Sequence, residues 1–262
     1  MGHNEMLIGE ALKGGRRRRA FIAVKFGALR GPDGGWIGYD LRPAAVKNFL
    51  AYSLRRLQTD YIDLYQPARY DHMVPLEDTL GAIADLVKAG YVCAIGQSEV
   101  SARTLRRAAS LQPIAALQIE YSLMSRGIES EILPAARELG IPIAAYGVLS
   151  RGLISDATLT NGAGSGDIRN RRPRFAGQNF ERNRALIAAL AKIAKARGAT
   201  VAQLAFAWLR SRGPDIVPLI GARSSPTRGR DYRSRSARTS SRPSSRRGRR
   251  TQPPASAMAR HR

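Results

Sequence analysis

The chain has 262 residues, a formal net charge of +23 and a single cysteine, Cys93. This length is enough for one full-sized domain, and one cysteine excludes a framework of disulfides. Cys93 lies in an apolar run and is predicted to be a small core residue. Because the sequence has neither an 18-residue apolar run nor an apolar signal segment, we expect a cytoplasmic protein without a transmembrane helix.

The charge is unevenly divided along the chain. The segment 224–262 contains twelve arginines and one acidic residue, so it carries nearly half of the net charge. It is rich in serine and proline and shows no period of 3.6 or 2, which predicts disorder. The sequence therefore predicts a folded domain over 1–223 and a disordered tail over 224–262.

The remaining sequence alternates short apolar runs with amphipathic segments. The first predicted helix has Asn4 as its N-cap and Gly14 at its end. A glycine-rich loop is predicted up to Asp40, and Thr200 with Gln203 predicts a capping box. The predicted strands cover 21–25, 61–65, 92–95, 115–119, 141–146 and 216–220, and the predicted helices cover 4–14, 43–57, 75–88, 102–110, 131–139, 183–197 and 201–211.

The segment 91–122 shows how these elements are connected. A strand, a helix capped by Ser101 and a second strand follow one another within about 30 residues, which defines a βαβ unit with parallel strands. Repetition of this unit gives six strands alternating with helices, the order of a (β/α) barrel. Because a closed barrel of this type has eight strands, the expectation is an α/β protein with an incomplete (β/α)8 TIM barrel, truncated at its front.

Polar residues follow several predicted strands at their carboxyl ends, for example Lys25, Ser98 and Gln118. Parallel α/β sheets bind their ligands at this edge. A long loop over 147–180 is typical of either a functional lid or a disordered segment. The pattern therefore predicts an enzyme whose ligand lies at the carboxyl ends of the strands.

Six short motifs, in order along the chain, resemble the strand ends of the aldo/keto reductases. The similarity covers about residues 2–223 and is greatest to the branch of pyridoxal reductases and other broad-specificity bacterial reductases. This resemblance implies a (β/α)8 barrel and an NADP(H)-dependent oxidoreductase that reduces an aldehyde or ketone without a metal. The motifs are GHNE at 2–5, VKF at 24–26, DYIDL at 60–64, IGQSE at 95–99, LQIEYS at 117–122 and YGVLSRG at 146–152.

The resemblance also implies catalytic roles. In the family a tyrosine donates the proton, and a lysine oriented by an aspartate lowers the pKa of that tyrosine. Lys25 matches the lysine, whereas the family's aspartate and tyrosine would precede Met1, so we expect impaired catalysis. Ala68 stands where the family commonly has a histidine, and His72 is predicted to be an ordinary loop residue. Tyr39, Tyr65 and Tyr70 are available phenols, but none of them matches the position of the family's tyrosine.

The same resemblance implies residues that bind the cofactor. Ser98, Glu99 and Gln118 match groups that hold the nicotinamide carboxamide, and Tyr146 matches an aromatic that stacks on the nicotinamide. The loop matched to the pyrophosphate contributes Gly147, Leu149, Arg151 and Gly152, and the segment matched to the adenosine 2′-phosphate begins with Gly221 and Arg223.

Two alternatives stay open at this point. The chain could be a catalytically inactive remnant of a reductase, or a basic-tailed protein that binds nucleic acid through the arginines of 228–250. The tail offers one aromatic for stacking, Tyr232, and no repeated motif, so binding to nucleic acid would be nonspecific at most. The expected partner is a small carbonyl compound rather than a membrane.

Overall fold

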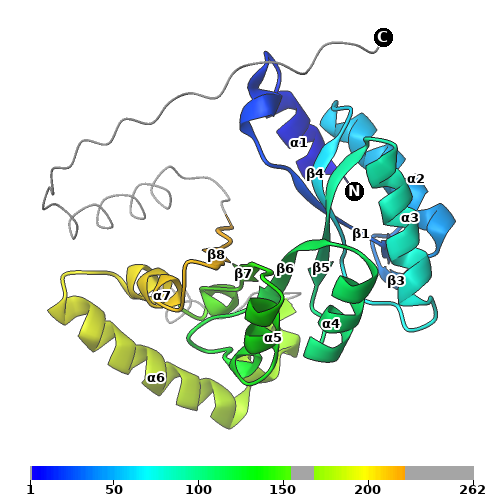
Figure 1. Cartoon of the computed structure of the whole chain (residues 1–262). Coiled ribbons are helices and arrows are strands. Elements are labelled where there is room, and N and C mark those ends of the chain that lie inside the picture. Colours follow the sequence, from blue (N-terminus) through cyan, green and yellow to red (C-terminus); the bar gives the residue numbers. More distant parts are fainter. Residues whose placement is uncertain (1, 155–167, 222–262) are drawn as a thin grey trace, which may run out of the picture. The chain divides into compact units, whose positions relative to one another are not determined.

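The computed structural model describes residues 2–154 and 168–221. Six parallel strands form one sheet in the order β1-β4-β5-β6-β7-β8, which confirms the six predicted strands (Figure 1). Within the described residues β1 and β8 are the two edges, and the sheet is not closed into a barrel. The strands are β1 (Ala23–Phe26), β4 (Ile62–Pro67), β5 (Val92–Ser98), β6 (Ile114–Glu120), β7 (Ile143–Tyr146) and β8 (Ile216–Pro218).

Four helices connect successive strands as the βαβ pattern predicts. They are α2 (Pro43–Leu57), α3 (Leu76–Lys88), α4 (Ala102–Leu111) and α5 (Ile132–Glu138). Neighbouring helices in this series pack on one another along one face of the sheet. Between β7 and β8 come α6 (Gly177–Ala196) and α7 (Val201–Arg210). No described helix is long and apolar enough to cross a lipid bilayer.

The helix boundaries follow from local sequence. Pro43 occupies the first turn of α2, where a missing N–H costs nothing. The Ser101 hydroxyl accepts a hydrogen bond from the Thr104 N–H at 3.2 Å and caps α4. The predicted capping box of α7 is confirmed, because the side chains of Thr200 and Gln203 each accept a bond from the other's backbone N–H.

Helix α1 (His3–Ala11) differs from its prediction. Its N-cap is Gly2 rather than Asn4, and its apolar residues are largely exposed, with Leu7 at 55%. Gly9 lets the helix approach the end of α2, since a Cβ there would lie 2.8 Å from the Arg56 carbonyl oxygen. The Glu5 carboxylate accepts hydrogen bonds from Ser53 Oγ at 2.6 Å and from Arg56 Nη1 at 3.0 Å, both on α2. The apolar side chains of this helix are therefore not what holds it to the rest of the structure.

The predicted glycine-rich loop contains a β-hairpin that the sequence did not indicate. Strands β2 (Ala28–Arg30) and β3 (Trp36–Tyr39) pair antiparallel. The turn is closed by a hydrogen bond from the Gly31 N–H to the Gly35 carbonyl at 2.9 Å. Glycines at the turn interrupt the alternation that marks strands, which is why the hairpin was missed.

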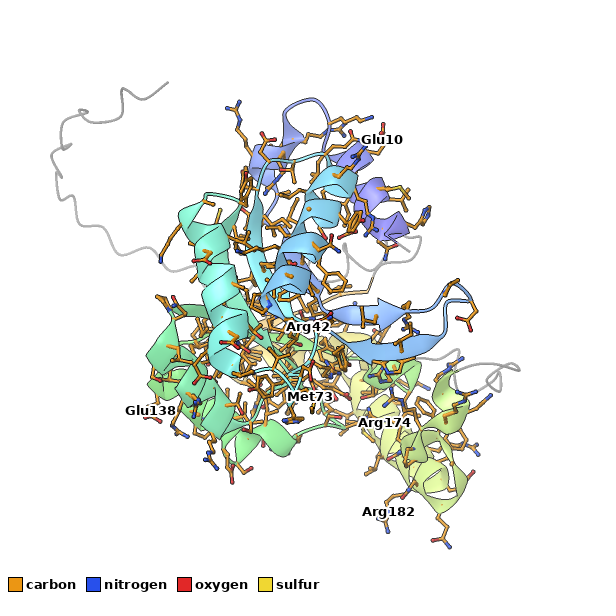
Figure 2. The ribbon with its side chains drawn as sticks, turned by 90° about the vertical axis from the view of Figure 1, so that its right-hand side faces the viewer. Glu10, Arg42, Met73, Glu138, Arg174 and Arg182 are labelled. Atoms are coloured by element: carbon orange, nitrogen blue, oxygen red, sulfur yellow. The ribbon has the colours of Figure 1, made fainter. Side chains whose placement is uncertain are left out.

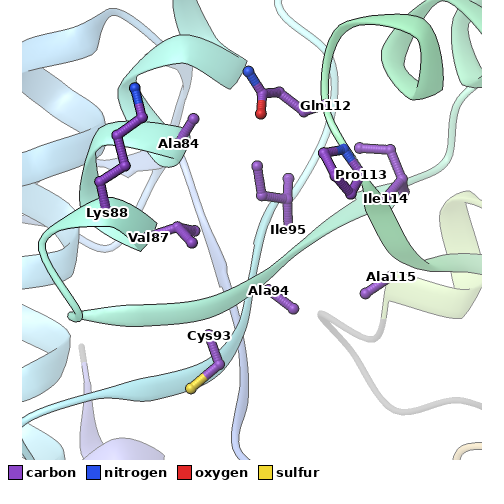
Figure 3. Close-up of a pocket in the computed structure, with 10 residues that line it drawn as sticks. All are labelled: Ala84, Val87, Lys88, Cys93, Ala94, Ile95, Gln112, Pro113, Ile114 and Ala115. Atoms are coloured by element: carbon purple, nitrogen blue, oxygen red, sulfur yellow. The ribbon is translucent and has the colours of Figure 1, made fainter.

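The prediction that Cys93 is a core residue is wrong, because its thiol is exposed. Cys93 borders a cavity of about 370 Å³ at the amino ends of β5 and β6, where the cover of α3 and α4 stops. Figure 3 shows Val87 and Lys88 of α3 on one side of this cavity and the segment 112–115 on the other.

Element ends account for the other differences. Phe21 was placed in the first strand, but it precedes β1 and is 72% exposed. Helix α6 begins at Gly177, within the predicted long loop, whose residues 155–167 lie outside the described part of the chain. The compact unit formed by the described residues ends at Gly221. Arg223 and the predicted tail 224–262 also lie outside the described residues, so the proposed domain boundary stays a prediction.

Candidate active site

Most of the predicted site residues meet at one edge of the sheet. Because the strands are parallel, their carboxyl ends lie together, and the register aligns residues that are distant in sequence. Three aligned pairs run across this edge: Lys25 with Gln66, Ser98 with Gln118, and Glu120 with Tyr146.

Lys25 has an unusual electrostatic environment at this edge. Its Nζ lies 5.7 Å from the centre of the Tyr146 ring, within reach of a cation–π interaction. Burial lowers the pKa of Lys25 below the ordinary value for lysine, the nearby Arg69 lowers it further, and Glu99 opposes both effects. The side chain is nevertheless accessible to solvent, so Lys25 is a reachable cation that gives up its proton more readily than an ordinary lysine.

Glu99 links the ends of β5, β6 and β7. It adopts a left-handed backbone conformation with φ of 56°, which costs a residue with a side chain about 1–2 kcal/mol. Two hydrogen bonds hold it there: its N–H donates to the Gln118 carbonyl at 3.0 Å, and its Oε1 accepts from the Glu120 N–H at 2.8 Å. Strain of this kind is typical of functional sites.

Tyr146 is the phenol that faces Glu99 and Lys25. Burial raises its pKa above the ordinary value for tyrosine, and the negative charge of Glu99 and a hydrogen bond with the Glu99 carboxylate raise it further. Tyr146 therefore stays a neutral phenol at physiological pH. A neutral aromatic face beside a cation can receive a flat, positively charged or polar ring.

An amide and a hydroxyl side chain, those of Gln66 and Ser98, are buried at the same edge. Gln66 is 2% exposed, and its Nε2 donates to Gln118 Oε1 at 2.8 Å. Within the described residues the Gln66 Oε1 and the Ser98 Oγ are buried and have no hydrogen-bond partner. A buried polar atom without a partner costs about 1–3 kcal/mol. Such atoms at strand ends indicate a site that a polar ligand completes.

The loop after β7 has an ordered left-handed backbone. Positive φ angles occur at Gly147, Ser150, Arg151 and Gly152, and the Ser150 N–H donates to the Gly147 carbonyl at 2.6 Å. Left-handed turns of this kind form concave surfaces that suit anions. Leu149 packs against the core, whereas the Arg151 side chain is exposed.

A salt bridge anchors a further segment to this edge. Arg174, in the 3₁₀ turn Pro173–Phe175, places Nη1 2.8 Å from Glu120 Oε1, and Ser125 Oγ donates to the same oxygen at 2.9 Å. The Arg174 carbonyl accepts from Asn183 Nδ2 of α6 at 2.9 Å. Figure 2 shows Arg174 toward the body of the structure and Arg182 pointing outward from α6. The chain before α6 is thus tied to the end of β6.

The structure places most of the predicted site residues together at this edge, but not all of them. It brings Lys25, Ser98, Glu99, Gln118 and Tyr146 together, and it places the loop containing Gly147, Leu149, Arg151 and Gly152 directly after Tyr146. Gly221 follows β8 at the end of the described residues, and Arg223 lies outside them.

Sequence reasoning missed three residues of this edge. Gln66, Glu120 and Arg174 were not assigned a role, although Gln66 is a polar residue at the end of a buried strand, which could have marked it. The described residues contain no group of three or more histidine, cysteine, aspartate or glutamate side chains placed to hold a metal ion.

A parallel α/β sheet with a polar, strained site at its carboxyl edge is the architecture of a ligand-binding α/β enzyme. The model of the Aldo/keto reductase family matches residues 1–228. The chain belongs to the aldo/keto reductase family, which confirms the resemblance of its motifs. The narrower similarity to pyridoxal reductases stays a prediction.

Two curated relatives illustrate the match. The chain is 42% identical over 220 residues to "Probable aldo-keto reductase 1" of Glycine max, which covers 83% of this chain and 63% of that protein. It is 39% identical over 227 residues to the aldo-keto reductase yakc of Schizosaccharomyces pombe, which covers 85% of this chain and 67% of that protein. The chain therefore spans about two thirds of the length of these curated relatives.

Among solved structures, the glycerol dehydrogenase from Gluconobacter oxydans superposes with a TM-score of 0.77 at 30% identity, covering 84% of this chain and 68% of that one. The likeness supports the predicted fold class for the described part of the sheet.

Proposed function

We propose that the chain is an NADP(H)-dependent oxidoreductase that reduces an aldehyde or ketone to an alcohol. Family membership supports this function, and the yakc relative carries NADP(+) in its name. The observation that carries the proposal is the juxtaposition of Lys25, whose pKa is lowered, with the Tyr146 ring. The small carbonyl substrate, with pyridoxal as the first candidate, would lie at this edge of the sheet.

The residues present fit the cofactor. Tyr146 would stack on the nicotinamide, and Ser98, Glu99 and Gln118 would hold its carboxamide. The Ser98 Oγ is buried without a partner, so a ligand amide would satisfy it. The left-handed loop that contains Gly147, Leu149, Arg151 and Gly152 suits the pyrophosphate, and Gly221 with Arg223 would contribute to binding of the 2′-phosphate.

The chain's own residues then contribute in three ways. Bound NADPH supplies a hydride for the carbonyl carbon. Lys25 would place a positive charge near the reacting centre, where it would stabilise negative charge developing on the carbonyl oxygen. Arg69 and Glu99 adjust the pKa of Lys25 in opposite directions. Tyr146, whose pKa burial and Glu99 both raise, offers an uncharged ring face.

Kinetics with a lysine variant tests this proposal. We expect the full chain to oxidise NADPH slowly with pyridoxal or a nitrobenzaldehyde, followed as loss of NADPH absorbance, because no residue of this chain matches the family's proton-donating tyrosine. Lys25→Met should reduce turnover by about 10²-fold or more, because the positive charge that stabilises the developing alkoxide is lost. Lys88→Met is the matched control, since Lys88 lines the cavity at the opposite end of β5, and it should leave turnover unchanged.

The assay separates the proposal from its alternative. A catalytically inactive family member would bind NADPH without oxidising it, and titration of NADPH fluorescence detects this outcome. Absence of NADPH binding would overturn the proposed function. Turnover that survives Lys25→Met would overturn the role of Lys25.

A further inference from the structure

The side chain of Gln66 reaches across the neighbouring strand, β5, to contact a residue of the site. It lies at the carboxyl end of β4, and its partner Gln118 lies on β6, with β5 between them. The hydrogen bond of 2.8 Å from Gln66 Nε2 to Gln118 Oε1 therefore spans three strands. This contact joins residues 52 positions apart in sequence.

Gly96 of β5 makes this crossing possible. A Cβ at Gly96 would lie 2.7 Å from Gln66 Oε1 and 3.1 Å from Gln66 Cβ, so the Gln66 side chain would have to shift to admit a methyl group. The φ of Gly96 is not in the left-handed region, so backbone conformation does not require glycine here. The space that glycine leaves is filled by the Gln66 side chain.

The Gln66 amide costs stability in the free protein. Its Oε1 is buried and, within the described residues, has no hydrogen-bond partner. An apolar side chain of similar shape would avoid this cost of an unpaired acceptor. A polar group kept at a cost to stability is typical of residues that serve a ligand.

The hydrogen-bond inventory of the pair defines what a ligand meets. A glutamine amide has one carbonyl acceptor and two N–H donors. Because Gln118 Oε1 accepts from Gln66, the Gln118 amide is held with its Nε2 as the group available for donation. Gln118 is partly exposed, whereas its partner Gln66 is buried. The site therefore presents a donor in a fixed orientation.

We propose that Gln66 is a positioning residue that orients Gln118 so that its N–H donates to the carbonyl oxygen of the nicotinamide carboxamide. The assignment rests on the proposed function, because it concerns the same cofactor. Gln66 acts through Gln118 and does not touch the cofactor. Its contribution is confined to the nicotinamide end of the dinucleotide.

The test compares two ligands of the full chain by calorimetric titration. NADP⁺ contains the carboxamide, and 2′-phospho-ADP-ribose is the same molecule without the nicotinamide. In Gln66→Met the NADP⁺ dissociation constant should rise about 3- to 10-fold, the value of one oriented hydrogen bond. The dissociation constant of 2′-phospho-ADP-ribose should not change, and the melting temperature should stay the same or rise.

Two further variants complete the design. Gly96→Ala pushes a methyl group against Gln66 from the other side, and it should weaken NADP⁺ with the same selectivity. Gln97→Met is the matched control: Gln97 is 1% exposed and also has an unpaired buried amide nitrogen, but strand alternation places it on the opposite face of β5 from Gly96 and Ser98. It should leave both dissociation constants unchanged.

Each outcome of these titrations either supports or overturns the positioning role of Gln66. Selective loss of NADP⁺ affinity in Gln66→Met and Gly96→Ala supports the positioning role. An equal loss for both ligands, or no loss in Gln66→Met, overturns it while leaving the proposed function in place. If the parent chain binds neither ligand, the proposed function is overturned and this assignment with it.

Discussion

The two ends of the parallel sheet differ in what they contain. The amino ends of β5 and β6 border a cavity of about 370 Å³ with a mostly apolar lining and an accessible thiol, Cys93. The carboxyl ends hold the buried unpaired atoms of Gln66 and Ser98, the left-handed Glu99 and the perturbed Lys25. The cavity provides space, whereas the opposite edge provides strain and unpaired polarity, which are the features that indicate chemistry.

The largest difference between the two ends should appear in cofactor binding. Tyr146→Ala removes the aromatic face at the carboxyl edge, and we expect the NADP⁺ dissociation constant to rise about 10-fold, the scale of one aromatic contact. Cys93→Ala, at the amino end, should leave it unchanged. Isothermal titration calorimetry measures both constants.

A conservative variant sharpens this comparison. Tyr146→Phe keeps the ring and loses the hydrogen bond with Glu99, so it should bind NADP⁺ much more tightly than Tyr146→Ala. If Cys93→Ala weakened NADP⁺ as much as Tyr146→Ala does, the assignment of the site to the carboxyl edge would be wrong.

Much of this fold could be predicted because its signals are local. Apolar runs marked the six strands, and proline and hydroxyl residues marked the starts of α2, α4 and α7. The sequence did not reveal the β2–β3 hairpin or the way in which α1 packs on α2. In α1 the packing residue is Gly9, which has no side chain to contribute to an apolar pattern, so the contact with the end of α2 depends on tertiary structure alone.

The site residues that lie within a motif could be predicted from the sequence. The contacts that join residues of different strands could not. Lys25, Ser98, Gln118 and Tyr146 each lie within one of the motifs that resemble the family. The bond between Gln66 and Gln118 depends on the space at Gly96, which only the register reveals. The salt bridge of Arg174 with Glu120 joins residues 54 positions apart, beyond the reach of any local pattern.

The pKa of Lys25 offers a second, more local test of the carboxyl edge. Burial and the charge of Arg69 lower this pKa, and the charge of Glu99 raises it. Arg69→Gln should therefore raise the pKa of Lys25 toward the ordinary value of 10.5, and Glu99→Gln should lower it further. The pH dependence of Lys25 acetylation by a trace of acetic anhydride, read by mass spectrometry, gives the pKa.

The sign of the pH effect follows from the same charges. Lys25 must be protonated to supply positive charge, so the alkaline loss of carbonyl reduction should begin at lower pH in Glu99→Gln and at higher pH in Arg69→Gln. Arg103→Gln, on the exposed side of α4, is the control and should not move the pKa of Lys25. Shifts of the same sign in both site variants would contradict this account of the electrostatics.

The smallest effect is expected from modification of Cys93, and it tests the comparison from the amino end. The exposed thiol should react completely with Ellman's reagent in the folded protein, because it borders an open cavity. Cys93 lies at the opposite end of β5 from Ser98, five residues of extended chain away, or roughly 17 Å at 3.3 Å per residue. The bulky adduct should therefore leave the NADP⁺ dissociation constant unchanged, as titration of the labelled and unlabelled protein would show. Loss of NADP⁺ binding on labelling, with the melting temperature unchanged, would mean that the two ends are coupled through the sheet and do not act independently.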